Sequence, residues 1–262
     1  MRGARIERVW LGRADLRSPF PDGFATRLRG QTVNELTRRG KYLLARLSSG
    51  DTLVMHLGMS GEFRLDGLFG TGGGLAEPGR HDHVTFEMSP AATITFNDPR
   101  RFGSMDLVAV GDARAHRVLG RLGPEPLADE FDAAVLAKAC RGKRTSLKAA
   151  LMDQRVVAGL GNIYVSEALH RARLSPRRRA STIATRAGAP REGASRLTAA
   201  IKTVLREAID RGESYPVRPS RRPRFRVYDR EGERCLRKEC PGTIKRITQV
   251  GRSTFFCPVC QK

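Results

Sequence analysis

The chain has 262 residues, of which 40% are hydrophobic, so it is long enough for two domains with hydrophobic cores plus a small module. No apolar run approaches the roughly 20 residues of a membrane span, which argues against a membrane protein. The net charge is +21, from 48 Lys and Arg against 27 Asp and Glu. This excess indicates a polyanionic partner, most often a nucleic acid, although an arginine-favouring genome would also give a basic surface.

The first part of the chain, up to about residue 107, is predicted to be mostly β-structure. Short apolar runs bounded by Gly, Asp and Pro are typical of the strands of a sandwich or barrel. A Gly-rich stretch over 67–79 is expected to be a flexible connection between strands. The expected strands are Lys41–Leu47, Thr52–Leu57, Val84–Met88, Thr93–Phe96 and Asp106–Val110.

The next part, from about residue 115 to 210, is predicted to be helical. Apolar residues recur at helical spacing, and a short Gly-containing turn at 158–161 joins two of the helices into a helix–turn–helix unit. The expected helices are Asp132–Cys140, Thr145–Val157, Asn162–His170 and Arg196–Ile209. The following linker, 213–226, is rich in Arg and Pro, and a solvated loop is as compatible with this composition as a phosphate-binding role.

Four cysteines near the end of the chain predict a metal site. Cys235 and Cys240 form one short pair, Cys257 and Cys260 form another, and sixteen residues lie between the pairs. Two such pairs separated by a β-hairpin suit four tetrahedral thiolate ligands of Zn²⁺. Two disulfides of a secreted domain are the alternative. The fifth cysteine, Cys140, lies in an Ala- and Leu-rich helical pattern and is expected to be a buried free thiol.

Three further stretches combine glycines with residues suited to DNA contact. They are His56–Gly61, Asn97–Gly103 and Gly159–Glu167. Met59, Arg100, Arg101 and Phe102 could grip phosphate and wedge into a base stack, and Asn162 begins a helix, where free backbone N–H groups attract phosphate.

Each of these residues also has an ordinary structural explanation. Taken singly, a Met or a Phe such as Met59 or Phe102 is more often a residue of the hydrophobic core. Arg100 and Arg101 would then only pair with Asp98. Asn162 would only cap its helix. Taken together, the residues favour a zinc-containing protein that binds DNA and distorts the duplex.

These stretches, in this order and followed by the cysteine pairs, resemble the formamidopyrimidine-DNA glycosylase family, which is related to endonuclease VIII. The resemblance covers nearly the whole chain, and His56–Gly61 with Asn97–Gly103 favours the formamidopyrimidine branch. It is supported by shorter matching pieces, namely Arg39–Leu44, His81–His83, Leu122–Leu127, Ala150–Asp153 and Arg252–Cys257.

The resemblance implies a multi-domain α+β protein in four parts: an N-terminal β-sandwich over 1–115, a helical helix–two-turn–helix domain over 116–212, the linker 213–226, and a zinc-finger β-hairpin over 227–262. It also implies a base-excision repair enzyme, DNA glycosylase and abasic-site lyase, that flips oxidised purines such as 8-oxoguanine out of the duplex. Partners would be Zn²⁺ and double-stranded DNA with oxidised bases or abasic sites, with no membrane. We expect a cytoplasmic monomer.

The resemblance also assigns roles to single residues. Lys41 matches the lysine of β-elimination and phosphate contact, and Arg252 matches the finger arginine linked to δ-elimination. Met59, Arg100 and Phe102 match the residues that fill the gap left by the flipped base. DNA-contacting positions are matched by His81, Arg100, Lys143 and Asn162. Arg101, the second cation of the Asp98–Phe102 turn, is also expected to contact DNA.

The chain departs from the family pattern at two places. The family opens on Pro-Glu-Leu-Pro-Glu, whose proline amine is the nucleophile and whose glutamate is the general acid, whereas this sequence begins Met1-Arg-Gly-Ala-Arg. We expect a start codon assigned too late. A truncated, catalytically inactive protein that binds damaged DNA through its zinc finger is the alternative. The linker also lacks the usual Gly-Tyr-Phe loop, which leaves the preferred lesion open.

A third hypothesis is a basic zinc-ribbon protein that binds RNA. The set of Met59, Arg100 and Phe102 argues against it, because A-form RNA offers little for wedge residues to enter.

Overall fold

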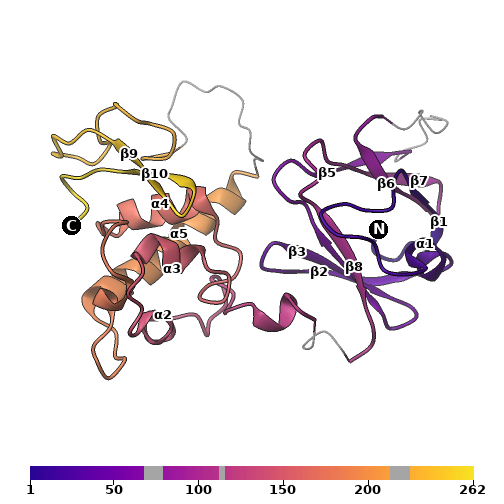
Figure 1. The fold of residues 1–262 in the computed structure, drawn as a ribbon, viewed down its shortest axis with the longest axis horizontal. Helices are drawn as coiled ribbons and strands as arrows, with labels where there is room; N and C mark the ends of the chain where they lie inside the picture. Colours follow the sequence, from indigo (N-terminus) through magenta and orange to yellow (C-terminus); the bar gives the residue numbers. More distant parts are fainter. Residues whose placement is uncertain (68–78, 112–115, 213–224) are drawn as a thin grey trace. The chain divides into compact units, whose positions relative to one another are not determined.

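The computed structural model describes residues 1–67, 79–111, 116–212 and 225–262 (Figure 1). The chain divides into two compact units, Met1–Gly120 and Arg121–Lys262. Most of the Gly-rich stretch expected over 67–79, and most of the Arg- and Pro-rich linker 213–226, lie outside the described residues.

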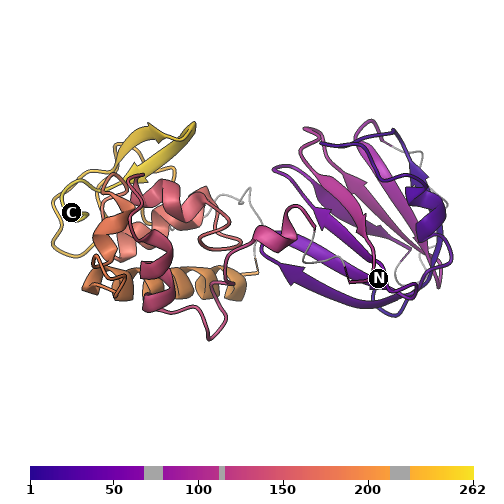
Figure 2. The ribbon, with the colours of Figure 1, turned by 60° about the horizontal axis from the view of Figure 1, so that its bottom comes forward.

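Antiparallel strands of unit 1 form two four-stranded sheets in its described part, with orders β1-β6-β7-β5 and β2-β3-β4-β8 (Figure 2). The strands are β1 (Ile6–Leu11), β2 (Val33–Arg39), β3 (Tyr42–Leu47), β4 (Thr52–His56), β5 (Glu62–Asp66), β6 (Asp82–Met88), β7 (Ala92–Asn97) and β8 (Ser104–Val108), and the short helix α1 spans Phe24–Leu28.

Both sheets contribute to one hydrophobic core. Leu53 and Met55 of β4 pack there with Phe86 of β6 and Phe96 of β7, and all four side chains are buried. Two sheets that bury facing apolar sides against each other make a β-sandwich. The predicted β-sandwich is therefore confirmed.

Strands β1, β2 and β5 are absent from the prediction. Each lies at the edge of its sheet, and most of its residues are exposed or half-buried. An edge strand with one solvent-exposed face carries many polar residues. It therefore lacks the continuous apolar run from which the sequence predicts inner strands.

Unit 2 is built of helices and a terminal hairpin. Its helices are α2 (Ala133–Cys140), α3 (Leu147–Met152), α4 (Asn162–Arg171) and α5 (Glu192–Asp210), with 3₁₀ turns η2 (Leu119–Arg121) at the unit boundary and η3 (Ala180–Ile183). Two of these helices have a side-chain N-cap. Asp132 accepts from Val135 N–H at the start of α2, and Ser146 accepts from Ala149 N–H at the start of α3. None of the described helices is long and apolar enough to cross a membrane.

The helix predicted over 145–157 is too long, because α3 ends at Met152. Side chains after that point bond to the backbone in place of helical hydrogen bonds. Asp153 accepts from Arg155 N–H at 3.0 Å, and the Gln154 amide donates to Met152 O at 3.2 Å. Turns over 153–161 then lead into α4, so the helix–turn–helix unit consists of α3 and α4.

The hairpin of unit 2 consists of β9 (Lys245–Gln249) and β10 (Arg252–Phe256), and β10 packs on α4 (Figure 2). A small separate core, which includes Val227, Ile244 and Phe255, lies beneath it.

Candidate metal centre and nucleic-acid interface

The Sγ atoms of the four predicted ligands converge in unit 2, within 4.8 Å of one another. Cys235 Sγ lies 3.8 Å from Cys260 Sγ, and Cys240 Sγ lies 3.7 Å from Cys257 Sγ. A disulfide would need about 2.05 Å, so the disulfide alternative is wrong.

The spacing of the sulfurs fits zinc. Thiolates about 2.3 Å from a tetrahedral Zn²⁺ lie about 3.8 Å apart, which is the spacing of the two short Sγ pairs. The remaining cysteine, Cys140, is free and fully buried in the helical core, as predicted. Burial raises the pKa of its thiol to about 11, so it stays protonated and outside the metal chemistry.

The metal centre also contacts helix α4. His170 is fully buried, and its Nε2 lies 3.3 Å from Cys235 Sγ. Arg237, from the four-residue spacer between Cys235 and Cys240, donates from Nη2 to the carbonyl of His170 at 2.7 Å. The first cysteine turn is therefore attached to the C-terminal end of α4.

Asp98 organises two of the motif loops in unit 1. Its fully buried carboxylate accepts from Ser60 Oγ at 2.6 Å and from Gly103 N–H at 2.8 Å. Its carbonyl accepts from His83 Nε2 at 2.9 Å. Gly58 has φ +69°, and an added Cβ there would lie 2.4 Å from the Phe102 carbonyl carbon. The loops after β4 and β7 are thus closely packed against each other.

The predicted wedge residues project from these loops into solvent. Met59 is 59% exposed and Phe102 is 47% exposed, so the hydrophobic-core explanation for them is wrong. Arg100 donates to Met59 Sδ at 2.7 Å, and its guanidinium lies 5.2 Å from the Phe102 ring centroid. The three side chains therefore form one cluster.

The ion-pair explanation for the arginines is also wrong within the described residues. The carboxylate oxygens of Asp98 face Ser60 and Gly103, and no ion pair joins Asp98 to Arg100 or Arg101 there. Arg101 is exposed in the left-handed region, at φ +56°.

Lys41 and His81 lie elsewhere in unit 1. Lys41 is exposed in the turn between β2 and β3, beside the end of β4, where Tyr42 pairs with His56. Burial lowers the pKa of His56, and the charges of Lys41 and Arg17 lower it further. His81 is half-buried, and its carbonyl accepts from Asp98 N–H at 3.0 Å.

Two of the predicted site residues of unit 2, Asn162 and Arg252, lie at the start of β10. Asn162 is the first residue of α4 after Gly161, and its side chain does not cap the helix. Its Nδ2 donates instead to the Ser253 carbonyl at 2.9 Å, beside the exposed Arg252. Lys148 donates from Nζ to the same carbonyl at 3.1 Å. Lys143 is half-buried in the segment between α2 and α3.

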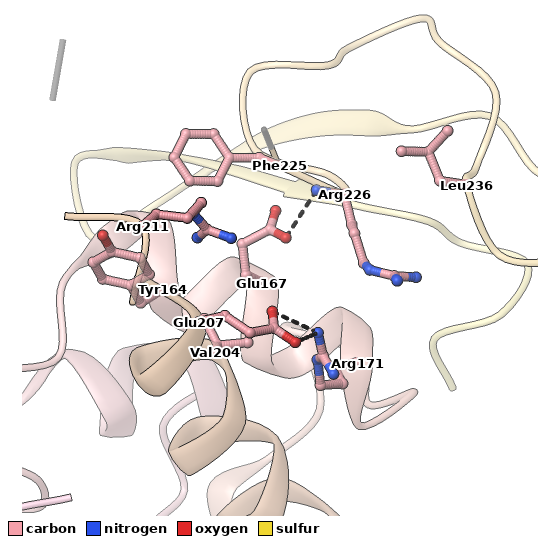
Figure 3. Close-up of a pocket in the computed structure, with 9 residues that line it drawn as sticks. All are labelled: Tyr164, Glu167, Arg171, Val204, Glu207, Arg211, Phe225, Arg226 and Leu236. Atoms are coloured by element: carbon pink, nitrogen blue, oxygen red, sulfur yellow. Dashed lines mark hydrogen bonds and ion pairs between the residues drawn. The ribbon is translucent and has the colours of Figure 1, made fainter. Parts of the chain in front are cut away.

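A pocket of about 290 Å³ lies in unit 2 between α4, α5 and the chain that enters the zinc module (Figure 3). Glu167 lines this pocket, and its carboxylate accepts from the backbone N–H groups of Arg226, Val227 and Tyr228 at 2.8 to 2.9 Å. The pocket wall also holds the ion pair of Arg171 with Glu207.

Sequence reasoning missed Lys148, Glu167 and His170. All three are charged or polar side chains, at most 6% exposed, on otherwise apolar helix faces. A polar residue on an apolar helix face indicates that its side chain has a hydrogen-bond or ion-pair partner in the fold. The sequence does not indicate which residue that partner is.

Comparison with known proteins gives matches over the whole chain. The formamidopyrimidine-DNA glycosylase N-terminal domain matches residues 1–105, the formamidopyrimidine-DNA glycosylase H2TH domain matches 122–217, and the zinc finger found in FPG and IleRS matches 232–262. A curated formamidopyrimidine-DNA glycosylase of Afipia carboxidovorans is 57% identical over 281 residues, which cover 100% of this chain and 94% of that protein.

Solved structures agree with this result. The formamidopyrimidine-DNA glycosylase of Lactococcus lactis, bound non-covalently to DNA that contains an abasic site, matches with a TM-score of 0.85 and 29% identity. A MutM complex with DNA that contains carbocyclic 8-oxo-G has the same TM-score and identity. Each comparison covers 100% of this chain and 94% of the other.

Proposed function

Because the chain belongs to the formamidopyrimidine-DNA glycosylase family, we propose that it excises oxidised purines, such as 8-oxoguanine and formamidopyrimidines, from duplex DNA in base excision repair. The observation that carries this proposal is the 57% identity, over the whole chain, with the Afipia carboxidovorans protein. We place the reaction in the bacterial cytoplasm, where chromosomal DNA lies.

The exposed cluster of Met59, Arg100 and Phe102 supports a base-flipping step. A base must leave the stack before its glycosidic bond can be reached, and apolar side chains that enter the gap offset the lost stacking. The arginine adds a charge that attracts the phosphate backbone. We assign this cluster to the gap left by the flipped nucleotide.

Phosphate contacts are assigned to Arg252, Lys143, Asn162, His81 and Arg101. Four of the five can carry positive charge, and Arg252 and Arg101 are exposed. Asn162 lies in the first turn of α4, where backbone N–H groups attract anions. Since one N–H of its amide donates to Ser253 O, we assign the phosphate contact to the other N–H and to the backbone. Zn²⁺ has a structural role here, in holding the hairpin that carries Arg252.

The glycosylase is tested with a duplex that contains one 8-oxoguanine, with release of the free base measured by mass spectrometry. Both the 262-residue chain and a form extended through the upstream codons of its gene are assayed. Base release from the damaged duplex, and none from an undamaged duplex of the same sequence, is expected. If neither form releases the base, the proposal is wrong.

We also propose that the protein is an abasic-site lyase. An amine of the protein would attack C1′ of the sugar and form a Schiff base, after which β- and δ-elimination cleave the strand. We assign Lys41 to β-elimination and Arg252 to δ-elimination, both with phosphate contacts. Lys41 is exposed, and its charge is near enough to His56 to lower the pKa of that imidazole, after the larger effect of burial.

Borohydride trapping on an abasic duplex tests the lyase. We expect a covalent adduct, and peptide mapping then identifies the amine that attacked. In Lys41→Ala the products of β- and δ-elimination should fall together, while in Arg252→Ala only δ-elimination should fall. Without an adduct from either form of the chain the lyase assignment fails, even if free base is released.

A further inference from the structure

The first cysteine turn is held by helix α4 through a side chain that belongs to neither the metal ligands nor the DNA-contacting residues. His170 ends the buried face of α4, and its Nε2 lies 3.3 Å from Cys235 Sγ. From the opposite direction, Arg237 donates from Nη2 to the carbonyls of His170 at 2.7 Å and Arg171 at 3.4 Å. Arg237 belongs to the four residues that separate Cys235 from Cys240. In zinc sites of this kind, two residues between the paired cysteines are commoner.

The chemistry of a zinc thiolate fixes the direction of the hydrogen bond. Cys235 binds the metal as a thiolate and carries no proton, so the hydrogen between the two atoms must come from Nε2. Among the described residues, the other ring nitrogen of His170, Nδ1, has no hydrogen-bond partner. The hydrogen bond to the thiolate therefore favours the neutral tautomer that carries its proton on Nε2. No described hydrogen bond to Nδ1 favours the other tautomer.

We propose that His170 is an outer-sphere ligand of the zinc site, a hydrogen-bond donor to the Cys235 thiolate that slows loss of the metal. An N–H that donates to a metal-bound thiolate withdraws charge from the sulfur, which makes it less basic and less nucleophilic. Attack on Cys235 by protons or electrophiles is slowed, and the sulfur is held in its coordinating position.

The same contact joins the metal site to the rest of unit 2. Helix α4 contacts the zinc module at three levels: Asn162 at its start bonds Ser253, Glu167 in its middle bonds residues 226–228, and His170 near its end bonds Cys235. The helix therefore contacts the zinc module both at the metal ligand Cys235 and at the strand that carries Arg252. This role is separate from glycosylase chemistry and does not depend on it.

The test replaces zinc with Co²⁺, whose sulfur-to-metal charge-transfer band reports on the electron density of the thiolates. His170→Phe keeps a planar ring without a donor, and His170→Gln places an N–H near the position of Nε2. His116→Phe, in unit 1, is the matched control. Transfer of zinc to a chromogenic chelator is measured on the same four proteins, each as the full chain.

In His170→Phe the charge-transfer band should move to lower energy, and zinc should be lost on the order of 10 times faster. His170→Gln should restore most of both properties, and the control should match the wild type. If His170→Phe leaves the band unmoved, or if His170→Gln loses zinc as fast as His170→Phe, His170 only fills space and the proposal is wrong.

A measurement on the wild-type protein covers the case in which a variant does not fold. Two-bond ¹H–¹⁵N correlation spectra of the zinc-loaded protein distinguish the tautomers of His170. A protonated Nε2 is expected, and a tautomer with its only proton on Nδ1 would overturn the proposal.

Discussion

Single buried polar side chains position the exposed residues proposed to contact DNA. Asp98 is fully buried, and its two carboxylate oxygens hold the loops that carry Met59 and Phe102. Lys148, 1% exposed, does the same in unit 2 for the strand that begins at Arg252. An unpaired buried group is costly, so each of these side chains fixes the backbone that satisfies it.

Replacing Asp98 with Asn should loosen both wedge loops. The amide nitrogen cannot accept the hydrogen bond that one carboxylate oxygen accepts now, so Ser60 or Gly103 loses its partner. We expect a loss of about 1 to 3 kcal/mol in the free energy of unfolding, measured by denaturant titration of unit 1. The exposed Asp66→Asn is the control, and an equal effect in both variants would contradict this role of Asp98.

Lys148 should give the protein a stability that rises in mild alkali. Burial, then the charge of Arg252, lowers the pKa of its ammonium group from 10.5 to about 8. Below pH 8 the group is charged in both the folded and the unfolded state, so the cost of burying the charge is fully present. Between about pH 8 and 10.5 the folded state releases its proton first, and this cost disappears.

Comparison with Lys148→Met isolates this effect, because other titrating groups cancel. The free energy of unfolding of the wild type should gain up to about 3 kcal/mol on that of the variant between pH 8 and 10.5. Urea titrations at a series of pH values measure the difference. Parallel curves for the two proteins would show that Lys148 is not desolvated in solution.

At the scale of elements, helix α4 is the support of the zinc module. The module has only a small core of its own, which includes Val227, Ile244 and Phe255. So small a core cannot supply much hydrophobic stabilisation, and a module of this size needs a metal and a docking surface. The contacts of Glu167 with three backbone N–H groups provide part of that surface.

Glu167→Gln should free the chain that enters the module. A neutral amide accepts more weakly than a carboxylate and offers one oxygen in place of two, so at least one of the three N–H groups loses its partner. Amide hydrogen exchange at Arg226, Val227 and Tyr228 should become faster by roughly 10-fold or more, since hydrogen bonds to charged groups are worth about 1.5 to 3 kcal/mol. Glu233→Gln, at an exposed position, is the control and should leave the exchange rates of these amides unchanged. Unchanged exchange rates in both variants would contradict the role of the Glu167 carboxylate in holding these three N–H groups.

At the scale of the whole molecule, the two units have separate hydrophobic cores, and the metal lies in the second. Metal binding is therefore linked directly to the stability of the second unit. Most of the positive charge belongs to the second unit, since residues 121–262 carry 31 Lys and Arg against 14 Asp and Glu, while residues 1–120 carry 17 against 13. This excess suits a partner with an anionic backbone.

Chelation of zinc should lower the melting temperature of unit 2 only, and it should abolish DNA binding. Differential scanning calorimetry with and without chelator, together with titration of a labelled duplex, measures both effects. Cys140→Ser, outside the metal site, is the control and should still respond to the chelator. Unimpaired duplex binding after zinc removal would contradict the role assigned to the hairpin.

Binding should also weaken steeply with salt, because each neutralised phosphate releases a condensed counterion. In a plot of log affinity against log salt, Arg252→Ala should reduce the slope by about 1. An unaltered slope would remove Arg252 from the phosphate contacts. Arg8→Ala, at an exposed residue that pairs with Glu87, is the control and should leave the slope unchanged.

The sequence alone determined the features that depend on local spacing. The cysteine pairs predicted the metal site, because two tight turns supply four thiolates wherever the rest of the chain lies. Apolar runs located the inner strands, while the edge strands β1, β2 and β5 escaped because their exposed faces are polar. The motifs that indicate the family were likewise readable before any fold was known.

Only the tertiary structure decided which polar residues have which partners. Nothing near His170 in the sequence points to Cys235, 65 residues away, and Lys148 meets the Ser253 carbonyl across 105 residues. The sequence left open whether Met59 and Phe102 are wedge residues or core residues, and the packing of two loops around Asp98 leaves both exposed. Burial and hydrogen-bond satisfaction are properties of the folded chain, so a pattern can show that a residue is unusual but not what it contacts.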